Sequence, residues 1–402
     1  MPKIVQINTV ANYGSTGKIM ESIGLLAKES GWISKIAVGG RYSNVSKLDT
    51  YLISNKCQNR MSAFHSLISG RHGLANKSET ERFIQWLRNE APDIVHLHNF
   101  HSYILNYEIL FDFLKEVNVP VVWTLHDCWP FTGHCSHFIK YNCYKWCQEC
   151  FDCPAIHDFP KSLFRDCSRI NYTDKKRIFG GLEKVRLVTV SNWLKSCVQR
   201  SLLGDYHVDV IHNGVDLSVF RPFHSDYRKL YNLEGKRILL GVSTDWCRSK
   251  GLYDYLKLGE ILGDDYRIVL LGMTVDQIKR YSRPGILCLP KTNSINELAN
   301  WYNSADIILN LSYAETFGLP VAEGYACGKP AIVYDNTALS ELIVPTTGFK
   351  VPTGDLRTLA SAIDSIFSSQ SFSTDACRER AVTYYNKETN YRRYLSLYND
   401  FL

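Results

Sequence analysis

The sequence contains no long apolar run and no export signal. We find no stretch of about 18 apolar residues, the minimum for a helix that crosses a bilayer. The first residues, MPKIVQINTV, lack the basic, apolar and small-residue zones of a signal peptide. The composition, 45% hydrophobic and 21% charged, excludes collagen-like, coiled-coil and disordered chains. We therefore expect a cytoplasmic protein without membrane-spanning helices.

The chain also lacks a large excess of charge of either sign. It has 46 Lys and Arg against 40 Asp and Glu, a net charge of +6, which is too small to require a nucleic acid partner. The largest local surplus lies between Lys161 and Arg186, where eight basic residues accompany three acidic ones. Such a run is usually a solvated face. It is also the segment that we expect to dock electrostatically on an anionic membrane surface.

Cysteine, in contrast, is abundant and clustered. Seven of the 13 cysteines lie between Cys128 and Cys167. Without an export signal, such a cluster predicts a metal or redox site rather than a disulfide framework. Because C-x2-C is a normal half-site for tetrahedral zinc, we expect one structural zinc. Its predicted ligands are Cys135, Cys143, Cys150 and Cys153. Nearby alternatives are His134, His137 and His157, and the remaining interpretation is a loop packed by reduced thiols.

Strand and helix patterns alternate along most of the chain. Val- and Ile-rich runs such as KIVQINTV, VPVVWTLHD and ADIILNLS are typical of strands buried on both faces. Between such runs lie predicted helices, among them Thr16–Ser30, Ser78–Asn89 and Tyr107–Val117. This alternation predicts parallel sheets with right-handed crossovers. We therefore expect an α/β protein with two doubly wound, Rossmann-like domains facing each other across a cleft.

The expected boundary lies near Asn213–Pro222. The first domain would span residues 1–215 and contain a Cys-rich insertion at about 128–167. The second would span residues 216–386. Residues 387–402 would form a C-terminal helix that packs back on the first domain, because its tyrosines and leucines are more apolar than a free tail requires.

Polar and glycine residues follow three of the predicted strands in the first domain. The segment Asn12–Lys18 (NYGSTGK) fits neither the P-loop nor the dinucleotide fingerprint. Its Gly14 and Gly17 either let a ligand approach the backbone or form a plain strand-to-helix turn. Two later strands end in His98 and His126, which indicates a polar site at that edge of the sheet.

In the second domain, the segment Glu315–Glu323 (ETFGLPVAE) follows a predicted strand. Pro320 suits the first helical position, so the helix should begin there. The backbone amides of Phe317, Gly318 and Leu319 would then form an anion site at the helix N-terminus. The alternative is a capping carboxylate and a surface glutamate.

These segments combine with VIHNGVD (210–216), FRP (220–222) and Lys250-Gly251 in one order along the chain. The combination resembles family 4 retaining glycosyltransferases, which have the GT-B fold. Residues 92–179 further resemble bacterial enzymes that build O-antigen, capsule or exopolysaccharide repeat units.

The resemblance implies roles for these residues. Glu323 would bind the ribose hydroxyls of a nucleotide-sugar, and Glu315 would contact the donor sugar. The amides of Phe317 to Leu319 would hold sugar hydroxyls or the diphosphate. Lys250 would neutralise the leaving diphosphate, and His126 would lie beside the reacting carbon.

The resemblance also extends to less specific positions. Gly14 and Gly17 would let the first loop approach the phosphate, and Thr292 lies where relatives contact the base through the backbone. Relatives usually place an arginine where Ser243 and Thr244 stand. Arg248 would then supply the second positive charge, or that phosphate contact is weaker.

The implied activity is metal-independent transfer of a sugar from a UDP- or GDP-linked donor to a lipid-diphosphate-linked saccharide. No cofactor would be required, and no Asp-x-Asp motif occurs. The enzyme would act at the inner face of the cytoplasmic membrane. A non-catalytic carbohydrate-binding or scaffold protein with the same fold is the alternative, while no lysine context suggests a pyridoxal-dependent phosphorylase.

Overall fold

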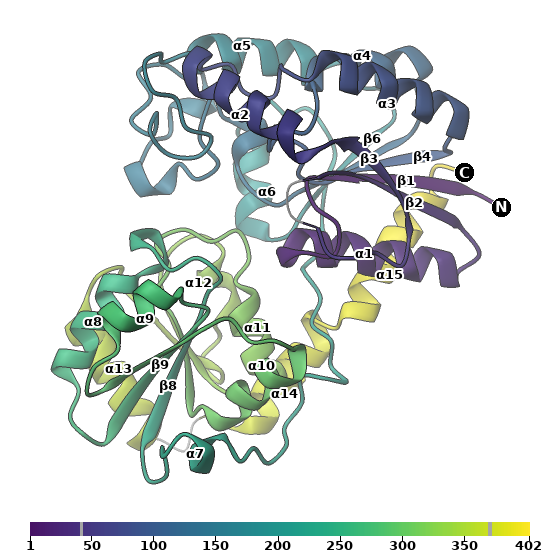
Figure 1. Cartoon of the computed structure of the whole chain (residues 1–402). Coiled ribbons are helices and arrows are strands. Elements are labelled where there is room, and N and C mark those ends of the chain that lie inside the picture. The colour runs from purple at the N-terminus through teal and green to yellow at the C-terminus, as the bar shows by residue number, and fades with distance from the viewer. Residues whose placement is uncertain (41–42, 369–371) are drawn as a thin grey trace. The chain divides into compact units, whose positions relative to one another are not determined.

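A computed structural model describes residues 1–40, 43–368 and 372–402 of the chain. The chain divides into two compact units (Figure 1). The first unit comprises Met1–Ile211 and Tyr391–Leu402, and the second comprises His212–Asn390. No described helix is both long enough and apolar enough to cross a membrane.

The first unit is built on a seven-stranded parallel sheet with the order β3-β2-β1-β4-β5-β6-β7. Its strands are β1 (Lys3–Asn8), β2 (Ile33–Gly39), β3 (Asp49–Ser54), β4 (Ile94–Leu97), β5 (Val121–Leu125), β6 (Val185–Thr189) and β7 (Val208–Val210). The central strands β4 and β5 are buried along their whole length, which explains why their sequences are almost entirely apolar.

Helices cover both faces of this sheet (Figure 1). They are α1 (Gly14–Glu29), α2 (Lys56–Ser69), α3 (Lys77–Glu90), α4 (Tyr107–Val117), α5 (Ser168–Phe179), α6 (Asn192–Gln199) and the end of α15 (Lys387–Asn399). Alternate residues of β5 contact opposite layers. Val122 packs in a cluster with Ile23 of α1 and Tyr394 of α15, whereas Trp123 stacks edge-on against Phe179 of α5. Both faces of the sheet are therefore part of the core.

The second unit has a six-stranded parallel sheet with the order β10-β9-β8-β11-β12-β13. Its strands are β8 (Arg237–Val242), β9 (Tyr266–Leu271), β10 (Ile286–Leu289), β11 (Ile307–Asn310), β12 (Ala331–Tyr334) and β13 (Gly348–Val351). Its helices are α7 (Tyr227–Leu230), α8 (Leu252–Ile261), α9 (Val275–Tyr281), α10 (Ile295–Ser304), α11 (Leu319–Ala326), α12 (Leu339–Leu342), α13 (Leu356–Ser368) and α14 (Thr374–Tyr384). The expected α/β class with two Rossmann-like, parallel-sheet units is confirmed.

The Cys-rich segment between β5 and α5 has little regular structure. It contains the short 3₁₀ helices η1 (Trp129–Phe131), η2 (Ile139–Tyr141) and η3 (Lys145–Cys147). Its packing depends on aromatic rings, since Trp146 contacts both Phe131 and Phe138. The segment is thus an insertion that directly follows β5, at the sheet edge where the carboxyl ends of the parallel strands lie.

Candidate active site

The loop between β11 and α11 places one acidic side chain before a helix start and one inside the helix. Gly318 has a φ of +101°, and a Cβ there would lie 2.7 Å from Leu339 Cδ2. Only glycine suits both the conformation and the space. Helix α11 begins at Leu319, one residue earlier than Pro320, because this left-handed glycine ends the loop. The ring of Phe317 is buried against His212 and Tyr385, so only its backbone can serve a ligand.

Glu315 and Lys250 form an ion pair at this helix start. The distance between Lys250 Nζ and Glu315 Oε1 is 2.5 Å, and Ser312 Oγ donates to the same oxygen at 3.1 Å. Lys250 ends the 3₁₀ helix η4 (Arg248–Lys250), which lies directly before α8. Burial alone would lower the pKa of Lys250, but the Glu315 carboxylate and its hydrogen bond raise the pKa above its usual value. The side chain therefore stays a cation.

Glu323 lies in α11 and is half-buried. Its Oε2 accepts a hydrogen bond of 2.6 Å from the hydroxyl of Tyr302 on α10. Burial, together with the Glu323 charge, holds the pKa of Tyr302 well above its usual value, so this hydroxyl remains a donor. The second carboxylate is thus oriented by a neutral, buried phenol. Sequence patterns gave no sign of Tyr302, because it follows a different strand.

The two remaining second-unit candidates follow β8 and β10, which lie on either side of β9 in the sheet. Arg248 is exposed and shares the 3₁₀ helix η4 with Lys250. Thr292 is half-buried between β10 and α10. Where relatives place an arginine, the Ser243 hydroxyl instead accepts from the backbone N–H of Asp245. The structure therefore has no cation at Ser243 or Thr244, and Arg248 and Lys250 lie on η4, a few residues further along the chain.

In the first unit, Gly14 and Gly17 lie in the first turn of α1. Gly14 has a φ of +61°, and no atom lies within 4 Å of the position of an added Cβ. At Gly17 an added Cβ would lie 3.1 Å from the carbonyl oxygen of Val10. Gly17 thus has a packing reason of its own, in that it lets α1 approach the preceding loop closely.

Three buried side chains form a hydrogen-bonded row at the ends of β1, β4 and β5. Gln6 Nε2 donates to the Met20 carbonyl at 3.1 Å, so Gln6 Oε1 faces His98 Nε2 as an acceptor, also at 3.1 Å. His98 must then carry its proton on Nε2, and its Nδ1 accepts from His126 Nε2 at 3.1 Å. His126 therefore carries its proton on Nε2. Burial lowers the pKa of His126 to about 4, so the ring is neutral near pH 7.

A second buried pair adjoins this row. His101 Nε2 lies 2.8 Å from Asp127 Oδ2, and the backbone N–H of Trp129 donates to Asp127 Oδ1 at 2.9 Å. Burial alone would raise the pKa of Asp127, but the facing His101 and these hydrogen bonds lower it to about 2. His101 was not among the predicted residues, although it follows His98 by only three positions.

The four predicted zinc ligands lie in the insertion as free thiols. The Gly133 N–H donates to Cys150 Sγ at 3.1 Å. Burial raises the pKa of Cys150 to about 11 and that of Cys153 to about 12. Burial and the neighbouring thiols of Cys153, Cys150 and Cys143 also raise the pKa of Cys135. Within the described residues, no three His, Cys, Asp or Glu side chains converge as metal ligands would. The zinc therefore stays a prediction.

Known proteins resemble this chain along most of its length. Residues 60–219 match the family model "Glycosyltransferase Family 4", and residues 243–369 match "Glycosyl transferases group 1". A protein of Escherichia coli K12, named as the colanic acid biosynthesis glycosyl transferase WcaC, is 22% identical over 324 residues, which is 78% of each chain. A D-inositol 3-phosphate glycosyltransferase of Paenarthrobacter aurescens is 31% identical over 154 residues, which is 34% of this chain and 37% of that protein.

Solved structures share the whole fold at low identity. Sucrose-phosphate synthase from Thermosynechococcus elongatus has a TM-score of 0.75 at 18% identity, covering 100% of this chain and 99% of that one. Anabaena Alr3699/HepE in complex with UDP has a TM-score of 0.71 at 13% identity, covering 100% of both chains. These likenesses agree with the two-unit architecture, and the family models confirm the predicted resemblance.

Proposed function

Both halves of the chain match glycosyltransferase family models, and we propose that it is a family 4 glycosyltransferase that moves a sugar from a nucleotide-sugar to a lipid-diphosphate-linked saccharide. The product would be part of a bacterial surface polysaccharide such as O-antigen, capsule or exopolysaccharide. The WcaC relative, named for colanic acid biosynthesis, supports the pathway class. The structural neighbour that was solved in complex with UDP supports a UDP-linked donor, and a GDP-linked donor is the alternative.

The Lys250–Glu315 pair at the start of α11 carries this proposal. When the donor reacts, the bond between the anomeric carbon and the diphosphate oxygen breaks, and its electron pair stays on the diphosphate. Lys250 and the amides of Phe317 to Leu319 would stabilise that charge, which a cation and a helix N-terminus can do without a metal ion. Glu315, which is paired with Lys250, would contact the donor sugar.

We propose retention of configuration by attack on the same face. The acceptor hydroxyl would form the new bond to the anomeric carbon, and its proton would pass to the departing diphosphate. His126 would lie beside the reacting carbon of the transferred sugar, with its Nε2 proton directed to His98. Glu323, oriented by Tyr302, would accept from the ribose hydroxyls.

The less specific candidates complete the proposed donor contacts. The backbone beside Thr292 would contact the base, and Arg248 would add a second cation near the diphosphate. The first turn of α1 at Gly14 and Gly17 would approach the phosphate. The enzyme would need no metal for catalysis, and chelation with EDTA should leave turnover unchanged.

The test begins with a panel of UDP- and GDP-sugars in thermal-shift measurements, followed by turnover with a lipid-diphosphate acceptor. Lys250→Met should lower kcat by roughly a hundredfold or more, since it removes charge stabilisation of the leaving group. Lys257→Met, a change at an exposed lysine on α8, is the matched control. Donor binding without any transfer or hydrolysis would instead support the non-catalytic carbohydrate-binding alternative.

A further inference from the structure

Helix α2 exposes its large apolar side chains and buries its small polar ones. Met61 and Phe64 are each 66% exposed, and Ile68 is also exposed. On the opposite side, Ser62 is 3% exposed and Ser66 is 1% exposed. A helix on the surface of a globular protein normally shows the reverse pattern. The outward face of α2 therefore has the composition of a contact surface.

Specific bonds fix this orientation of α2. The Asn55 side chain accepts from the backbone of Cys57 and Gln58 in a capping box, and Gly70 ends the helix in the left-handed conformation. On the inner face, Ser66 Oγ is hydrogen-bonded to His72 Nδ1. Because both helix ends and the inner face are held, the apolar side chains cannot turn inward without breaking these contacts.

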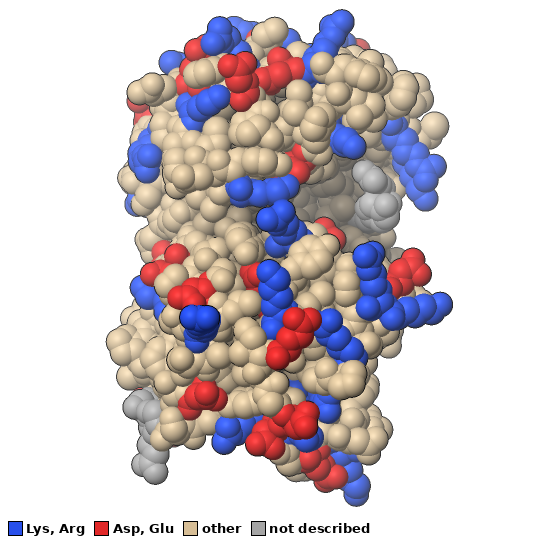
Figure 2. All heavy atoms as spheres, turned by 90° about the vertical axis from the view of Figure 1, so that its left-hand side faces the viewer, with Lys and Arg blue, Asp and Glu red and all other residues tan. Residues whose placement is uncertain are grey.

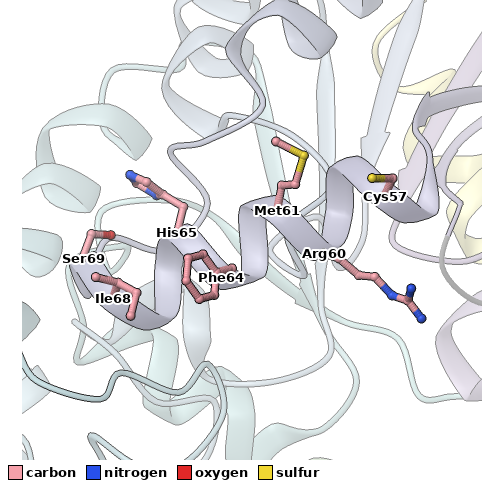
Figure 3. A pocket seen from close by; sticks show the side chains of 7 residues that line it. All are labelled: Cys57, Arg60, Met61, Phe64, His65, Ile68 and Ser69. Atoms are coloured by element: carbon pink, nitrogen blue, oxygen red, sulfur yellow. The ribbon is translucent and has the colours of Figure 1, made fainter.

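The apolar residues gather on one side of the helix. Met61, Phe64 and Ile68 are spaced by three and four residues, so they share one face. Figure 3 shows these side chains along α2, where with Arg60 and His65 they line a surface pocket of about 520 Å³.

A neighbouring loop extends this surface. The backbone N–H of Leu163 donates to the carbonyl of Leu67, at the C-terminal end of α2, at 2.9 Å. Leu163 is exposed, and Phe164 is 75% exposed. We call the set of Met61, Phe64, Ile68, Leu163 and Phe164 the α2 apolar surface.

Basic side chains predominate around the α2 apolar surface, where the exposed Asp166, next to Arg165, accepts from the backbone N–H groups of Cys153 and Ser168. Helix α2 carries Lys56 and Arg60 and contains no Asp or Glu, and the loop 161–165 (KSLFR) carries Lys161 and Arg165 and likewise none. All four basic side chains are exposed, and none forms an ion pair with another described residue. On the face of the chain shown in Figure 2, basic and acidic side chains are interspersed.

We propose that the α2 apolar surface docks on an anionic lipid bilayer, with its apolar side chains at the headgroup boundary and the four cations on lipid phosphates. An exposed apolar face rimmed by Lys and Arg suits this interface. The inference extends the proposed function, because a lipid-linked acceptor is reached at a membrane. It differs from docking through the whole basic run 161–186, in which Lys175 is buried and Arg177 is paired with Glu108.

A second copy of the chain fits this surface less well. Stable protein interfaces use about 20–30 residues on each side, and the α2 apolar surface offers five. In a symmetric dimer the same four cations would also face each other, which is unfavourable. A bilayer imposes neither requirement.

The experiment measures sedimentation of the full-length protein with vesicles, without donor or acceptor. The wild type should bind vesicles of phosphatidylglycerol mixed with phosphatidylcholine, and added salt should weaken the binding only in part. The triple variant Met61→Ser, Phe64→Ser, Ile68→Ser should reduce the partition coefficient by about tenfold or more. The double variant Lys56→Glu, Arg60→Glu should reduce binding mainly at low salt.

Matched controls lie in the second unit, where Leu230, Val275 and Ile295 are also exposed. Their triple replacement by serine, and the pair Lys257→Glu, Lys279→Glu, should leave vesicle binding unchanged. Circular dichroism verifies that each variant is folded.

Two results would overturn the proposal. One is a wild type that binds no vesicle, and the other is an apolar variant that sediments as the wild type does. A concentration-dependent dimer that the apolar variant abolishes would assign the surface to a second copy. Because sedimentation needs no turnover, vesicle binding by a protein without transferase activity would refute the proposed function alone.

Discussion

At the residue scale, the two acidic side chains of the α11 loop have partners of opposite kinds. Glu315 is paired with a cation, Lys250, whereas Glu323 accepts a hydrogen bond from the neutral hydroxyl of Tyr302. Glu315 is bound to a cation, so its interactions should change when charge develops nearby during the reaction. Glu323 is held by a phenol and is suited to accept hydrogen bonds from neutral hydroxyl groups. Because the two partners differ, we expect replacement of Glu315 to act mainly on kcat and replacement of Glu323 to act mainly on donor binding.

Glu323→Ala should weaken binding of the nucleotide-sugar, because a hydrogen bond to a charged group contributes about 1.5–3 kcal/mol. Glu315→Ala should lower kcat more than it weakens binding, since its contact would strengthen as the donor bond breaks. Calorimetry gives the binding constants, and initial rates give kcat. Tyr302→Phe is the graded control, with a smaller loss of binding than Glu323→Ala. Wild-type constants in both alanine variants would contradict the assigned roles.

The row Gln6–His98–His126 predicts a fixed tautomer for each ring. Gln6→Leu removes the acceptor of the His98 Nε2 proton, and an unsatisfied buried donor costs about 1–3 kcal/mol of unfolding free energy. ¹⁵N NMR of labelled histidines should show Nε2-protonated rings in the wild type and mixed tautomers for His98 and His126 in the variant. Identical tautomer signals in the two proteins would show that Gln6 does not position the row.

His126 also makes stability depend on pH. Burial lowers its pKa from 6.5 to about 4 in the folded protein, so between these values the unfolded chain binds the proton and the folded chain does not. Stability is therefore lost as the pH falls, by about 2 kcal/mol between pH 7 and pH 5 for this group. Urea unfolding should show a flatter pH dependence for His126→Asn than for the wild type. The exposed His224→Asn variant should keep the wild-type slope.

At the scale of elements, sequence patterns predicted the central strands, the edge strands β7 and β10 and most of the helices between them, but not the edge strands β3 and β13. The predicted helix Tyr107–Val117 is α4 to the residue. Strands β3 and β13 were not among the predicted strands. In β3 the first four residues are exposed or half-buried, so the apolar run that marks a central strand is missing. Strand β3 therefore lacks the local pattern by which the other strands were predicted.

The Cys-rich insertion gives the element-scale prediction. Lys175 is buried, with its Nζ on the carbonyls of Trp129 and Thr132 at 2.6 and 2.9 Å. Burial strongly lowers the pKa of this lysine, against the opposing influence of Cys150, Asp127 and Cys135. Zinc bound to the thiolates of Cys135, Cys143, Cys150 and Cys153 would be a net anion and would favour the protonated form of Lys175. We therefore expect about one zinc per chain.

Metal analysis of tag-free protein purified under reducing conditions measures this directly. Cys150→Ser and Cys153→Ser should each lower the zinc content and the melting temperature. The exposed Cys57→Ser is the matched control and should change neither. A stable, active protein without zinc would leave only the interpretation of packed, reduced thiols.

At the scale of the whole molecule, the fold of each unit could be predicted from sequence more fully than the side-chain contacts of its candidate site. The strand ends carrying Glu315 and His126 follow from the parallel topology. Tyr302, His101 and Gln6 could not be predicted, because each contacts its partner across strands or helices far apart in the chain. The contacts of Gln6 and His101 depend on the sheet order, which brings β1, β4 and β5 side by side, whereas that of Tyr302 depends on the packing of α10 against α11.

The C-terminal segment shows the same dependence on distant contacts. Residues Tyr391–Leu402 belong to the first unit, although the chain reaches them only after the whole second unit. Tyr398 is fully buried, and its hydroxyl lies 2.6 Å from His96 Nδ1 on β4. Its ring also contacts Trp32. The last turns of α15 thus complete the core beneath β4.

Tyr398→Ala should therefore destabilise the first unit by about 3–5 kcal/mol, the usual cost of removing a large buried aromatic ring. The loss leaves His96 Nδ1 without its partner and opens a cavity beside Trp32, so the effect should exceed that of Tyr398→Phe, which removes only the hydroxyl. Tyr384→Ala, at an exposed tyrosine on α14, is the matched control and should cost little. Urea unfolding followed by hydrogen exchange should locate the lost protection in β4 and α1, while β8 and β11 keep theirs. Equal losses in both sheets would mean that the segment stabilises the chain as a whole rather than the unit into which it packs.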